Sequence, residues 1–281
     1  MTFQEIRFHF RQKMTDLYDV SEIETLFFMG FEALFGKKKI DLVLHPNETL
    51  SDENLQKWNQ FLSKLMLGKP IQYILGTTEF YGLPFIVNEN VLIPRPETEE
   101  LIDWILEDFQ QKDEISILEI GSGSGCIPIV LNAKMPQAKI VSWDVSEKAL
   151  ETAQKNNQLN KTKVAFELQD ILKVENIPFS VDVIVSNPPY VQITEQAEMK
   201  KNVLDFEPHL ALFVPENDPL LFYRKIGTLA WQHLNKNGAL YFEINQYLGN
   251  ETMELLRAIG FQNLELRKDF MKNDRMIKAM K

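Results

Sequence analysis

An apolar segment that runs without a break into three closely spaced glycines constrains the fold of this chain most. Residues 117–120 read Ile-Leu-Glu-Ile, residues 121–125 read Gly-Ser-Gly-Ser-Gly, and a helical pattern follows. Glycines permit a tight turn from strand to helix and let a ligand approach the backbone, while free N–H groups at the start of a helix favour an anionic group. The segment predicts a ligand-binding strand, loop and helix.

Strand and helix patterns alternate around this segment. Strands are expected at 115–120, 139–143, 164–168, 181–186, 239–244, 262–266 and 276–280, and helices at 124–135, 146–158, 219–234 and 251–259. Strands separated by helical stretches indicate βαβ units and a largely parallel sheet. The fold class predicted for this part of the chain is therefore α/β.

Residues 1–70 have a different pattern, that of a small helical bundle. Apolar residues recur every three or four positions over residues 3–18, from Phe3 to Leu17, as in an amphipathic helix. Ser21 and Ser51 are the expected N-caps of a second and a third helix. The bundle is expected to end near Pro70, because proline disfavours further helix.

Residues 71–92 are expected to connect the bundle to the α/β region. Short apolar runs at 79–81 and 85–87 flank a Gly-Leu-Pro turn, which predicts a β-hairpin over residues 77–87. The expected organisation is thus a helical domain at 1–70, a hairpin linker at 71–92 and a ligand-binding domain at 93–281.

Composition and charge narrow the class of protein. The 281 residues include one cysteine, Cys126, so no internal disulfide demands an oxidising compartment. No uncharged run approaches the roughly 18–20 residues of a membrane span, and the expected location is cytoplasmic. The four histidines are scattered, so no metal site is expected.

The net charge speaks against binding to nucleic-acid phosphates. The chain has 30 Lys and Arg against 40 Asp and Glu, a formal net charge of −10. Almost all of the acidic excess falls in residues 76–281, which speaks against a general phosphate-backbone footprint. Residues 1–75 are nearly neutral and could approach an anionic assembly more easily.

Asp144 adds to the evidence for a nucleoside ligand. It ends the strand that follows the glycine loop, where a carboxylate in a doubly wound sheet can accept both hydroxyls of a ribose. A dinucleotide fingerprint would have glycine at the position of Cys126, so the spacing instead resembles the S-adenosylmethionine loop of seven-stranded methyltransferases. Cys126 is expected to be a small, unreactive side chain that packs the helix against the sheet.

The residues after the fourth strand indicate the chemistry. Residues 181–186 are an apolar run that leads into Asn187-Pro188-Pro189-Tyr190, and ligands bind at the carboxyl ends of strands in open α/β sheets. Asn187 offers an amide oxygen, the proline peptides offer carbonyls, and Tyr190 offers an aromatic face. These groups suit a planar –NH2 on an sp2 carbon, whose two hydrogens need acceptors.

The sequence resembles a known family at this motif and elsewhere. Asn-Pro-Pro-Tyr is the signature of enzymes that methylate amino groups of adenine, guanine or glutamine. The stretches at 70–76, 79–81, 92–99 (Leu-Ile-Pro-Arg-Pro-Glu-Thr-Glu) and 206–212 are similar to those of the protein-(glutamine-N5) methyltransferases that modify peptide chain release factors. The resemblance covers essentially the whole chain and implies a seven-stranded, Rossmann-like class I methyltransferase domain preceded by a small helical domain.

The resemblance also implies a cofactor, a substrate and roles for individual residues. The methyl donor would be S-adenosylmethionine, with S-adenosylhomocysteine as product, and the substrate would be the glutamine of the Gly-Gly-Gln motif in class I release factors. The implied cofactor residues are Gly121, Ser122, Gly123, Ser124, Gly125, Asp144, Asp170, Ile171 and Asn187. The implied catalytic residues are Asn187, Pro188 and Tyr190, and the substrate residues are these three with Pro189. Arg95 and Glu97 are candidate catalysts from their residue types, but a structural role that locks the hairpin to the next helix is an equally good interpretation.

Some residues of this sequence differ from the family pattern, and two other functions remain compatible with parts of the sequence. Asn245 and Asn273 stand where the family has glycine, and residues 213–218 lack glycines that are usual there. A DNA or RNA amino-methyltransferase would share residues 187–190 and flip a base onto Tyr190, but would need a basic groove. A noncatalytic protein that binds release factors or ribosomes could retain the helical bundle.

Overall fold

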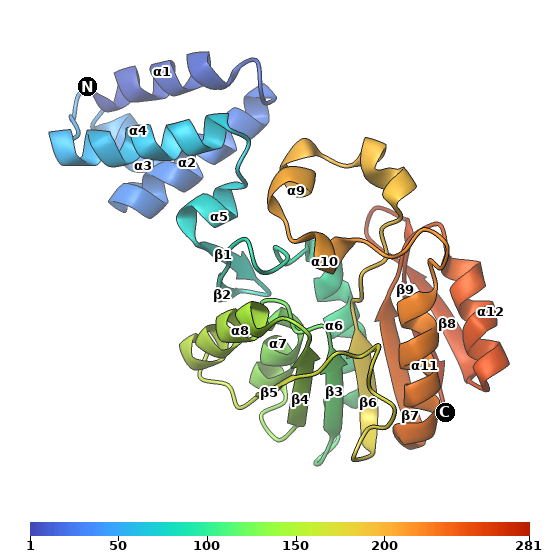
Figure 1. Ribbon diagram of the computed structural model, residues 1–281. Coiled ribbons are helices and arrows are strands. Elements are labelled where there is room, and N and C mark those ends of the chain that lie inside the picture. The colour runs from blue at the N-terminus through green and yellow to red at the C-terminus, as the bar shows by residue number, and fades with distance from the viewer. The chain divides into compact units, whose positions relative to one another are not determined.

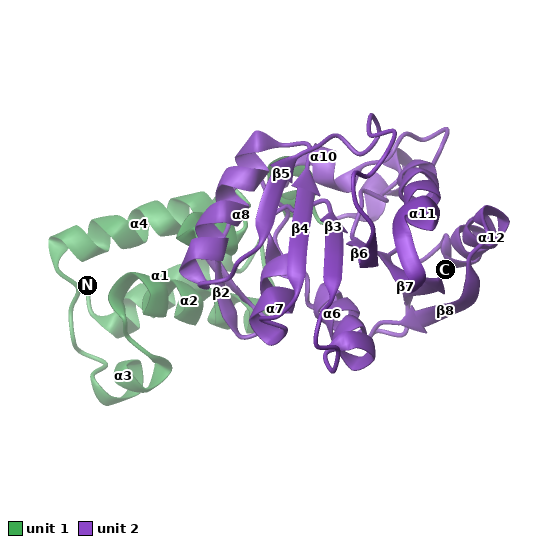
Figure 2. Cartoon of the chain, turned by 90° about the horizontal axis from the view of Figure 1, so that it is seen from below, with its two compact units in different colours: residues 1–76, 200–206 green, residues 77–199, 207–281 purple.

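The computed structural model describes residues 1–281, which divide into two compact units (Figure 2). The first unit comprises residues 1–76 and 200–206, and the second comprises residues 77–199 and 207–281. The division therefore lies at Gly76, beyond the predicted end of the bundle at Pro70, and the hairpin groups with the second unit. None of the helices combines the length and the apolar character needed to span a membrane.

The first unit is helical and has its own aromatic core. Its helices are α1 (Phe3–Met14), α2 (Val20–Phe35), α3 (Lys39–Leu44), α4 (Asp52–Met66), α5 (Ile71–Leu75) and α9 (Lys201–Phe206). The rings of Phe10, Phe27 and Phe31 pack around Trp58. Helices α2 and α4 approach closely at Gly30, where an added Cβ would collide with the ring of Phe61, so a larger residue there would have to displace that buried ring.

Helix starts in this unit match the sequence prediction only in part. The Ser51 hydroxyl accepts the Asn54 N–H at 3.3 Å and caps α4, as predicted. The predicted cap at Ser21 is wrong, because α2 begins at Val20 after Asp19, whose carbonyl accepts the Ile23 N–H at 2.9 Å. The earlier start adds a helical hydrogen bond that a cap at Ser21 would lose. Leu17, predicted on the apolar face of the first helix, is exposed beyond the end of α1.

The hairpin forms where it was predicted. Strands β1 (Thr77–Phe80) and β2 (Leu83–Ile86) pair antiparallel. The Asn156 side chain holds β2 through both atoms of its amide: Oδ1 accepts the Ile86 N–H at 2.6 Å, and Nδ2 donates to the Ile86 carbonyl at 2.9 Å. Asn156 is fully buried in α8 (Glu147–Leu159), so these bonds fasten the hairpin to the rest of the second unit.

The second unit is built on a seven-stranded sheet, as predicted. Its strands are β3 (Ser116–Ile120), β4 (Lys139–Asp144), β5 (Ala165–Leu168), β6 (Val181–Ser186), β7 (Leu234–Glu243), β8 (Gln262–Lys268) and β9 (Asp274–Met280). The order is β5-β4-β3-β6-β7-β9-β8, and every neighbouring pair is parallel except those that involve β9. The helices are α6 (Pro96–Phe109), α7 (Cys126–Lys134), α8 (Glu147–Leu159), α10 (His209–Leu212), α11 (Leu221–His233) and α12 (Gly249–Ile259), with a 3₁₀ helix at Ile193–Glu198.

Alternate residues of the strands pack against helices on opposite faces of the sheet (Figure 1). Helices α6 and α7 cover the face that presents Ile117, Val183, Val185 and Tyr241. Helices α11 and α12 cover the face that presents Leu118, Ile184, Leu240 and Phe242. This alternation follows from the two-residue period of a strand and explains why both faces are apolar.

The strand order sets the position of the site. After β3 the chain builds β4 and β5 toward one edge, then returns to place β6 on the other side of β3. The segments that follow β3 and β6 therefore leave the sheet side by side at its carboxyl edge, which is where open α/β sheets bind ligands. These are the two segments that begin at Gly121 and Asn187.

Candidate active site

A cavity of about 380 Å³ lies at this carboxyl edge of the second unit. Most of the predicted site residues line it: Gly121, Ser122, Gly123, Ser124, Asp144, Asp170, Ile171, Asn187, Pro188 and Pro189. Gly125 and Tyr190 are not among the lining residues. The fold thus brings together residues from four separate strand ends, as the sequence predicted.

The glycine loop provides room at the cavity wall. Gly121, Gly123 and Gly125 have positive φ angles of 96°, 53° and 80°, which side-chain-bearing residues rarely adopt. A Cβ at Gly125 would also lie 2.9 Å from Ile129 Cδ1, so this glycine lets the start of α7 pack closely. A Cβ at Gly123 would meet no atom within 4 Å, so there the backbone conformation is what requires glycine.

The backbone N–H groups of the loop are used differently from the prediction. Gly121 and Ser122 donate to the Trp143 carbonyl at 2.8 and 3.1 Å, and Gly125 donates to the Ser122 carbonyl at 2.7 Å. Gly123 donates to Oδ2 of Asp144 at 2.9 Å. The expectation that these four N–H groups are free to bind a ligand is therefore wrong. They donate to oxygen atoms of the protein itself and so fix the conformation of the loop. The loop contributes open space to the cavity rather than hydrogen-bond donors.

Asp144 is held at the cavity by two backbone donors. Its Oδ2 accepts from Gly123, and its Oδ1 accepts the Ser146 N–H at 2.8 Å. Burial raises the pKa of Asp144 above its usual value, although these two hydrogen bonds lower it. A carboxylate has about four acceptor positions, so Asp144 keeps acceptor capacity for a ligand.

Asp170 and Ile171 line the same cavity from the end of β5. The Lys173 ammonium pairs with Oδ2 of Asp170 at 2.9 Å and helps lower the pKa of that carboxyl. Ile171 is 9% exposed and packs in the core around Trp143. The pair offers an apolar surface beside a charged acceptor.

Glu119 is a cavity residue that the sequence reasoning missed. It is 1% exposed in β3, its Oε2 accepts the Ser142 hydroxyl, and its Oε1 has no partner. Burial raises the pKa of Glu119 to about 8. A charged residue inside an apolar strand was the available signal, since such a residue is rarely buried without a role.

Cys126 also lines the cavity and has the inert character that was expected. Burial raises the pKa of its thiol to about 12. The nucleophilic form of cysteine is the thiolate, so Cys126 stays protonated and contributes packing.

Only three of the four residues in the motif at 187–190, which follows β6, line the cavity. Asn187, Pro188 and Pro189 line the cavity, whereas the Tyr190 hydroxyl donates to Oε1 of Glu243 at 3.1 Å. The Tyr190 carbonyl accepts from Nδ2 of Asn245 at 3.0 Å. The structure therefore differs from the expectation that Tyr190 presents an aromatic face to the ligand: its ring and hydroxyl anchor the motif to the protein.

Arg95 and Glu207 join two stretches that resemble the family. Arg95 Nη2 lies 2.6 Å from Oε1 of Glu207, and the Ile93 N–H donates to Oε2 of the same carboxylate at 3.3 Å. Glu207 is buried. Arg95 thus has a structural partner, as interpreted from the sequence, but that partner precedes α10 and is not in the hairpin.

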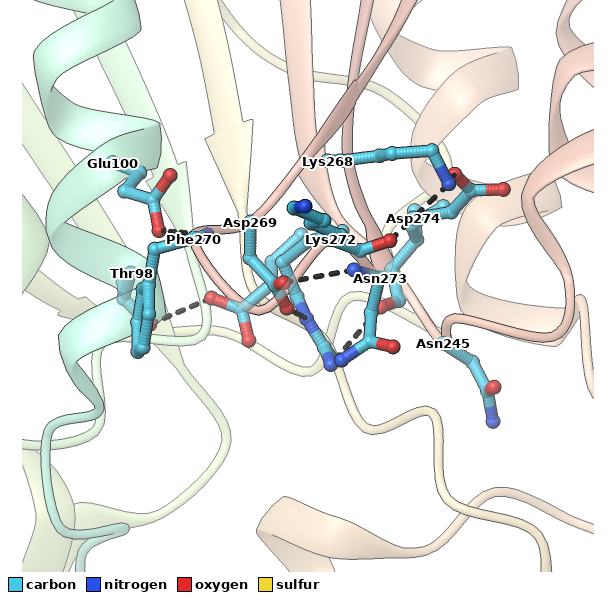
Figure 3. A network of polar contacts seen from close by, with 12 residues as sticks. Thr98, Glu100, Asn245, Lys268, Asp269, Phe270, Lys272, Asn273 and Asp274 are labelled. Carbon is cyan, nitrogen blue, oxygen red and sulfur yellow. Dashed lines mark hydrogen bonds and ion pairs between the residues drawn. The ribbon is translucent and has the colours of Figure 1, made fainter.

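Of the two asparagines that replace expected glycines, Asn245 uses its side chain in hydrogen bonds, whereas the bond of Asn273 comes from its backbone N–H, which a glycine would also supply. Nδ2 of Asn245 donates to the Tyr190 carbonyl and, at 2.8 Å, to Oε1 of Glu195. The Asn273 N–H donates to Oδ1 of Asp269 at 2.9 Å in the turn between β8 and β9 (Figure 3). Asn245 therefore ties the motif after β6 to the 3₁₀ helix that follows it.

Comparison with known proteins decides the family. Residues 28–76 match the PrmC N-terminal domain, and residues 102–205 match the Methyltransferase small domain. The chain is 52% identical to the release factor glutamine methyltransferase of Flavobacterium psychrophilum over 99% of both chains. This chain belongs to the release factor glutamine methyltransferase family.

Further relatives agree with this membership. The release factor glutamine methyltransferase of Bacteroides thetaiotaomicron is 41% identical over 96% of this chain and 97% of its own. The fold is shared with the Thermus thermophilus 16S rRNA N2 G1207 methyltransferase RsmC, whose structure was solved in complex with AdoMet and guanosine. That comparison has a TM-score of 0.53 and 17% identity over 73% of this chain and 49% of the other. The chain thus has the fold and the family membership of a methyltransferase.

Proposed function

We propose that this enzyme transfers a methyl group from S-adenosylmethionine to the side-chain nitrogen (N5) of the glutamine in the Gly-Gly-Gln motif of class I release factors. One observation carries the proposal: Asn187 and Pro188 line the same cavity as the glycine loop and Asp144. A site for a nucleoside and a pair of acceptors for a planar –NH2 group are therefore adjacent.

The residues of the cavity fit S-adenosylmethionine. Its volume of about 380 Å³ is in the range of small-molecule sites. Asp144 has acceptor positions left for a ribose diol, and Ile171 and Asp170 offer an apolar surface and an acceptor for adenine. The unpartnered Oε1 of Glu119 suits the ammonium of the methionine part. When bound, the cofactor would supply an electrophilic methyl group on a sulfonium.

The protein's contribution to the chemistry is mainly positioning. An amide nitrogen is a poor nucleophile because its lone pair is delocalised into the carbonyl. The Asn187 oxygen and the Pro188 carbonyl would accept the two N–H bonds of the glutamine and fix the direction of its nitrogen. Well-oriented approach supplies roughly 7–11 kcal/mol in intramolecular reactions. The same acceptors gain strength as the nitrogen becomes positive.

Recognition of the protein substrate is proposed for residues 1–70. A glutamine side chain offers little that distinguishes it from other glutamines, so specificity requires contacts elsewhere. Binding energy gathered at remote contacts can order a flexible substrate loop at the reacting centre. The helical unit is the part of the chain that the reacting residues do not use.

Parallel methyl-transfer assays test the function. Purified enzyme and radiolabelled S-adenosylmethionine are incubated with release factor, with release factor whose Gly-Gly-Gln glutamine is replaced by alanine, with DNA and with RNA. We expect label in the first substrate alone. Label in the alanine variant would refute the assigned glutamine. Greater label in RNA or DNA would favour an amino-methyltransferase of nucleic acid.

A further inference from the structure

A series of hydrogen bonds that the proposed reaction has not yet used runs from Asn187 through Thr98, which also lines the cavity, to Glu243. The Asn187 Nδ2 donates to Oγ1 of Thr98 at 3.4 Å, and Oγ1 of Thr98 donates to Oε2 of Glu243 at 2.6 Å. Thr98 and Glu243 are 2% and 1% exposed. Figure 3 shows Thr98 on its helix, joined to this carboxylate by a dashed line.

Because a hydroxyl has only one proton, the donors and acceptors in this series of hydrogen bonds are fixed. Thr98 has a single proton on Oγ1, and the short bond to Glu243 uses it. Toward Asn187 the hydroxyl can then only accept, and only the –NH2 end of the Asn187 amide can donate. The bond of 3.4 Å is at the long end for N–H···O, as bonds in an active site without ligand often are.

The Glu243 carboxylate is the final acceptor in this series of hydrogen bonds. It receives the Thr98 hydroxyl on one oxygen and the Tyr190 hydroxyl on the other, at 3.1 Å. Arg275 Nη1 lies 3.5 Å from the Tyr190 oxygen, and Arg275 Nε pairs with Oδ2 of Asp269 at 3.1 Å. Burial raises the pKa of Glu243, while the Thr98 hydroxyl, the Arg275 charge and the Tyr190 hydroxyl lower it. In its ionised form the carboxylate accepts and cannot donate, so both hydroxyl protons then point at Glu243.

We propose that Thr98 and Glu243 are positioning residues that set the orientation of the Asn187 amide, with –NH2 toward Thr98 and the carbonyl oxygen toward the substrate. An asparagine amide is nearly symmetric in shape, so packing alone distinguishes its two orientations poorly. The reversed orientation would present a donor to the glutamine –NH2, which also only donates. This inference rests on the proposed role of Asn187.

Three substitutions separate this role from packing. Thr98→Val keeps the shape and removes the hydroxyl. Thr98→Ser keeps the hydroxyl. In Glu243→Gln the new side-chain –NH2 can donate to Oγ1 of Thr98. The Thr98 hydroxyl proton is then free to donate to the Asn187 oxygen, which favours the reversed orientation of the Asn187 amide. Thr252→Val is the matched control, because Thr252 is a fully buried threonine on α12 whose hydroxyl bonds only within its helix and which does not line the cavity.

Kinetics on release factor give the first readout. We expect Thr98→Val and Glu243→Gln to lower kcat about tenfold, the upper worth of one hydrogen bond, with the dissociation constant for S-adenosylmethionine within about twofold of wild type by calorimetry. Thr98→Ser should recover most of the loss. Equal losses in Thr98→Val and Thr98→Ser, or wild-type kcat in Thr98→Val, would overturn the proposal.

A nuclear magnetic resonance readout does not depend on activity. The side-chain –NH2 signals of Asn187 are assigned by their absence in Asn187→Ala. In the wild type we expect one proton shifted downfield and slow rotation of the amide, and in Thr98→Val the loss of that shift. If the variants fail to fold, the wild-type spectrum decides, because an Asn187 –NH2 without the bonded shift contradicts the orientation. If instead the wild type shows the shift but does not methylate release factor, the proposed function fails and the orientation stands.

Discussion

Arg95 reaches across 112 residues of sequence to Glu207, with 2.6 Å between Nη2 and Oε1. The carboxylate end of this pair is buried, while about a third of the Arg95 side chain is exposed. Glu207 also accepts the Ile93 N–H. The pair therefore holds the segment before α6 against the segment before α10, and both segments line the cavity.

Loss of Arg95 should destabilise the enzyme. Arg95→Ala leaves the Glu207 carboxylate buried with one partner fewer, which costs about 1–3 kcal/mol. We expect a decrease of this size in the free energy of unfolding, measured with urea. Arg95→Ala combined with Glu207→Gln should recover part of it, because the buried charge is gone. A single variant as stable as wild type would mean that water replaces the guanidinium at no cost.

Asn187→Ala should abolish methyl transfer while the fold is kept. The substitution removes the acceptor that aims the substrate nitrogen, and Asn187 is not part of either apolar core. The checks are radiolabel transfer to release factor, the melting temperature, and binding of S-adenosylmethionine by calorimetry. Near-normal turnover in this variant would remove the proposed mechanism.

Asp144→Ala should weaken binding of S-adenosylmethionine by about 1.5–3 kcal/mol, the worth of hydrogen bonds to a charged group. The substitution also removes the acceptor of the Gly123 N–H, which in the wild-type enzyme donates to Oδ2 of Asp144. Asp144→Asn is the useful companion, since its remaining oxygen can keep the loop bond while the charge is lost. An unchanged dissociation constant in both variants would show that Asp144 does not hold the ribose.

Glu119 should make the stability of the ligand-free protein depend on pH. Its pKa is about 8 in the folded state against 4.5 as the ordinary value, so the folded state holds the proton more tightly. The free energy of unfolding should therefore fall as pH rises from about 4.5 to about 8, by about 1.4 kcal/mol per pH unit from this group. Urea titrations at several pH values check this.

The control for Glu119 compares variants by the slope of the free energy of unfolding against pH. Glu119→Gln should remove this contribution, whereas replacement of Glu251, which is exposed on α12, by Gln should leave the slope as in wild type. Parallel slopes in wild type and Glu119→Gln would mean that Glu119 is ionised throughout the range.

Deletion of residues 1–70 should impair methylation of intact release factor far more than methylation of a short Gly-Gly-Gln peptide. The proposed docking contacts exist only with the intact substrate, so the peptide does not lose them. Both proteins must first be shown to fold and to bind S-adenosylmethionine, because α9 groups with the helical unit. Equal losses on both substrates would argue for a structural role alone.

Local patterns were sufficient to predict the sheet and most of the cavity. The loop after β3 and the motif after β6 are each readable from fewer than ten consecutive residues, and the strand order brings them together. Ser51 was predictable as a cap because its bond to Asn54 is local. The start of α2 was not, since Asp19 and Ser21 are both good cap residues and tertiary packing chooses between them.

The part of the site that sequence could not predict depends on distant partners. Thr98 and Glu243 are 145 residues apart, and no local pattern pairs a threonine in the first turn of a helix with an acid at the end of a strand. Tyr190 was expected to face the ligand because its partners, Glu243 and Asn245, lie on segments far along the chain. Buried polar groups reveal their roles only when their partners are known.

The order of synthesis gives the bond between Thr98 and Glu243 a consequence for the newborn protein. The ribosome releases the glycine loop and the Asn187 motif well before the last residue of β7, and Glu243 is that residue. A nascent chain that extends to Tyr190 has the cavity residues that follow β3, β4, β5 and β6 but lacks Glu243, the acceptor proposed to orient Asn187. If Glu243 orients Asn187 as proposed, catalytic competence arises only after β7 has been synthesised.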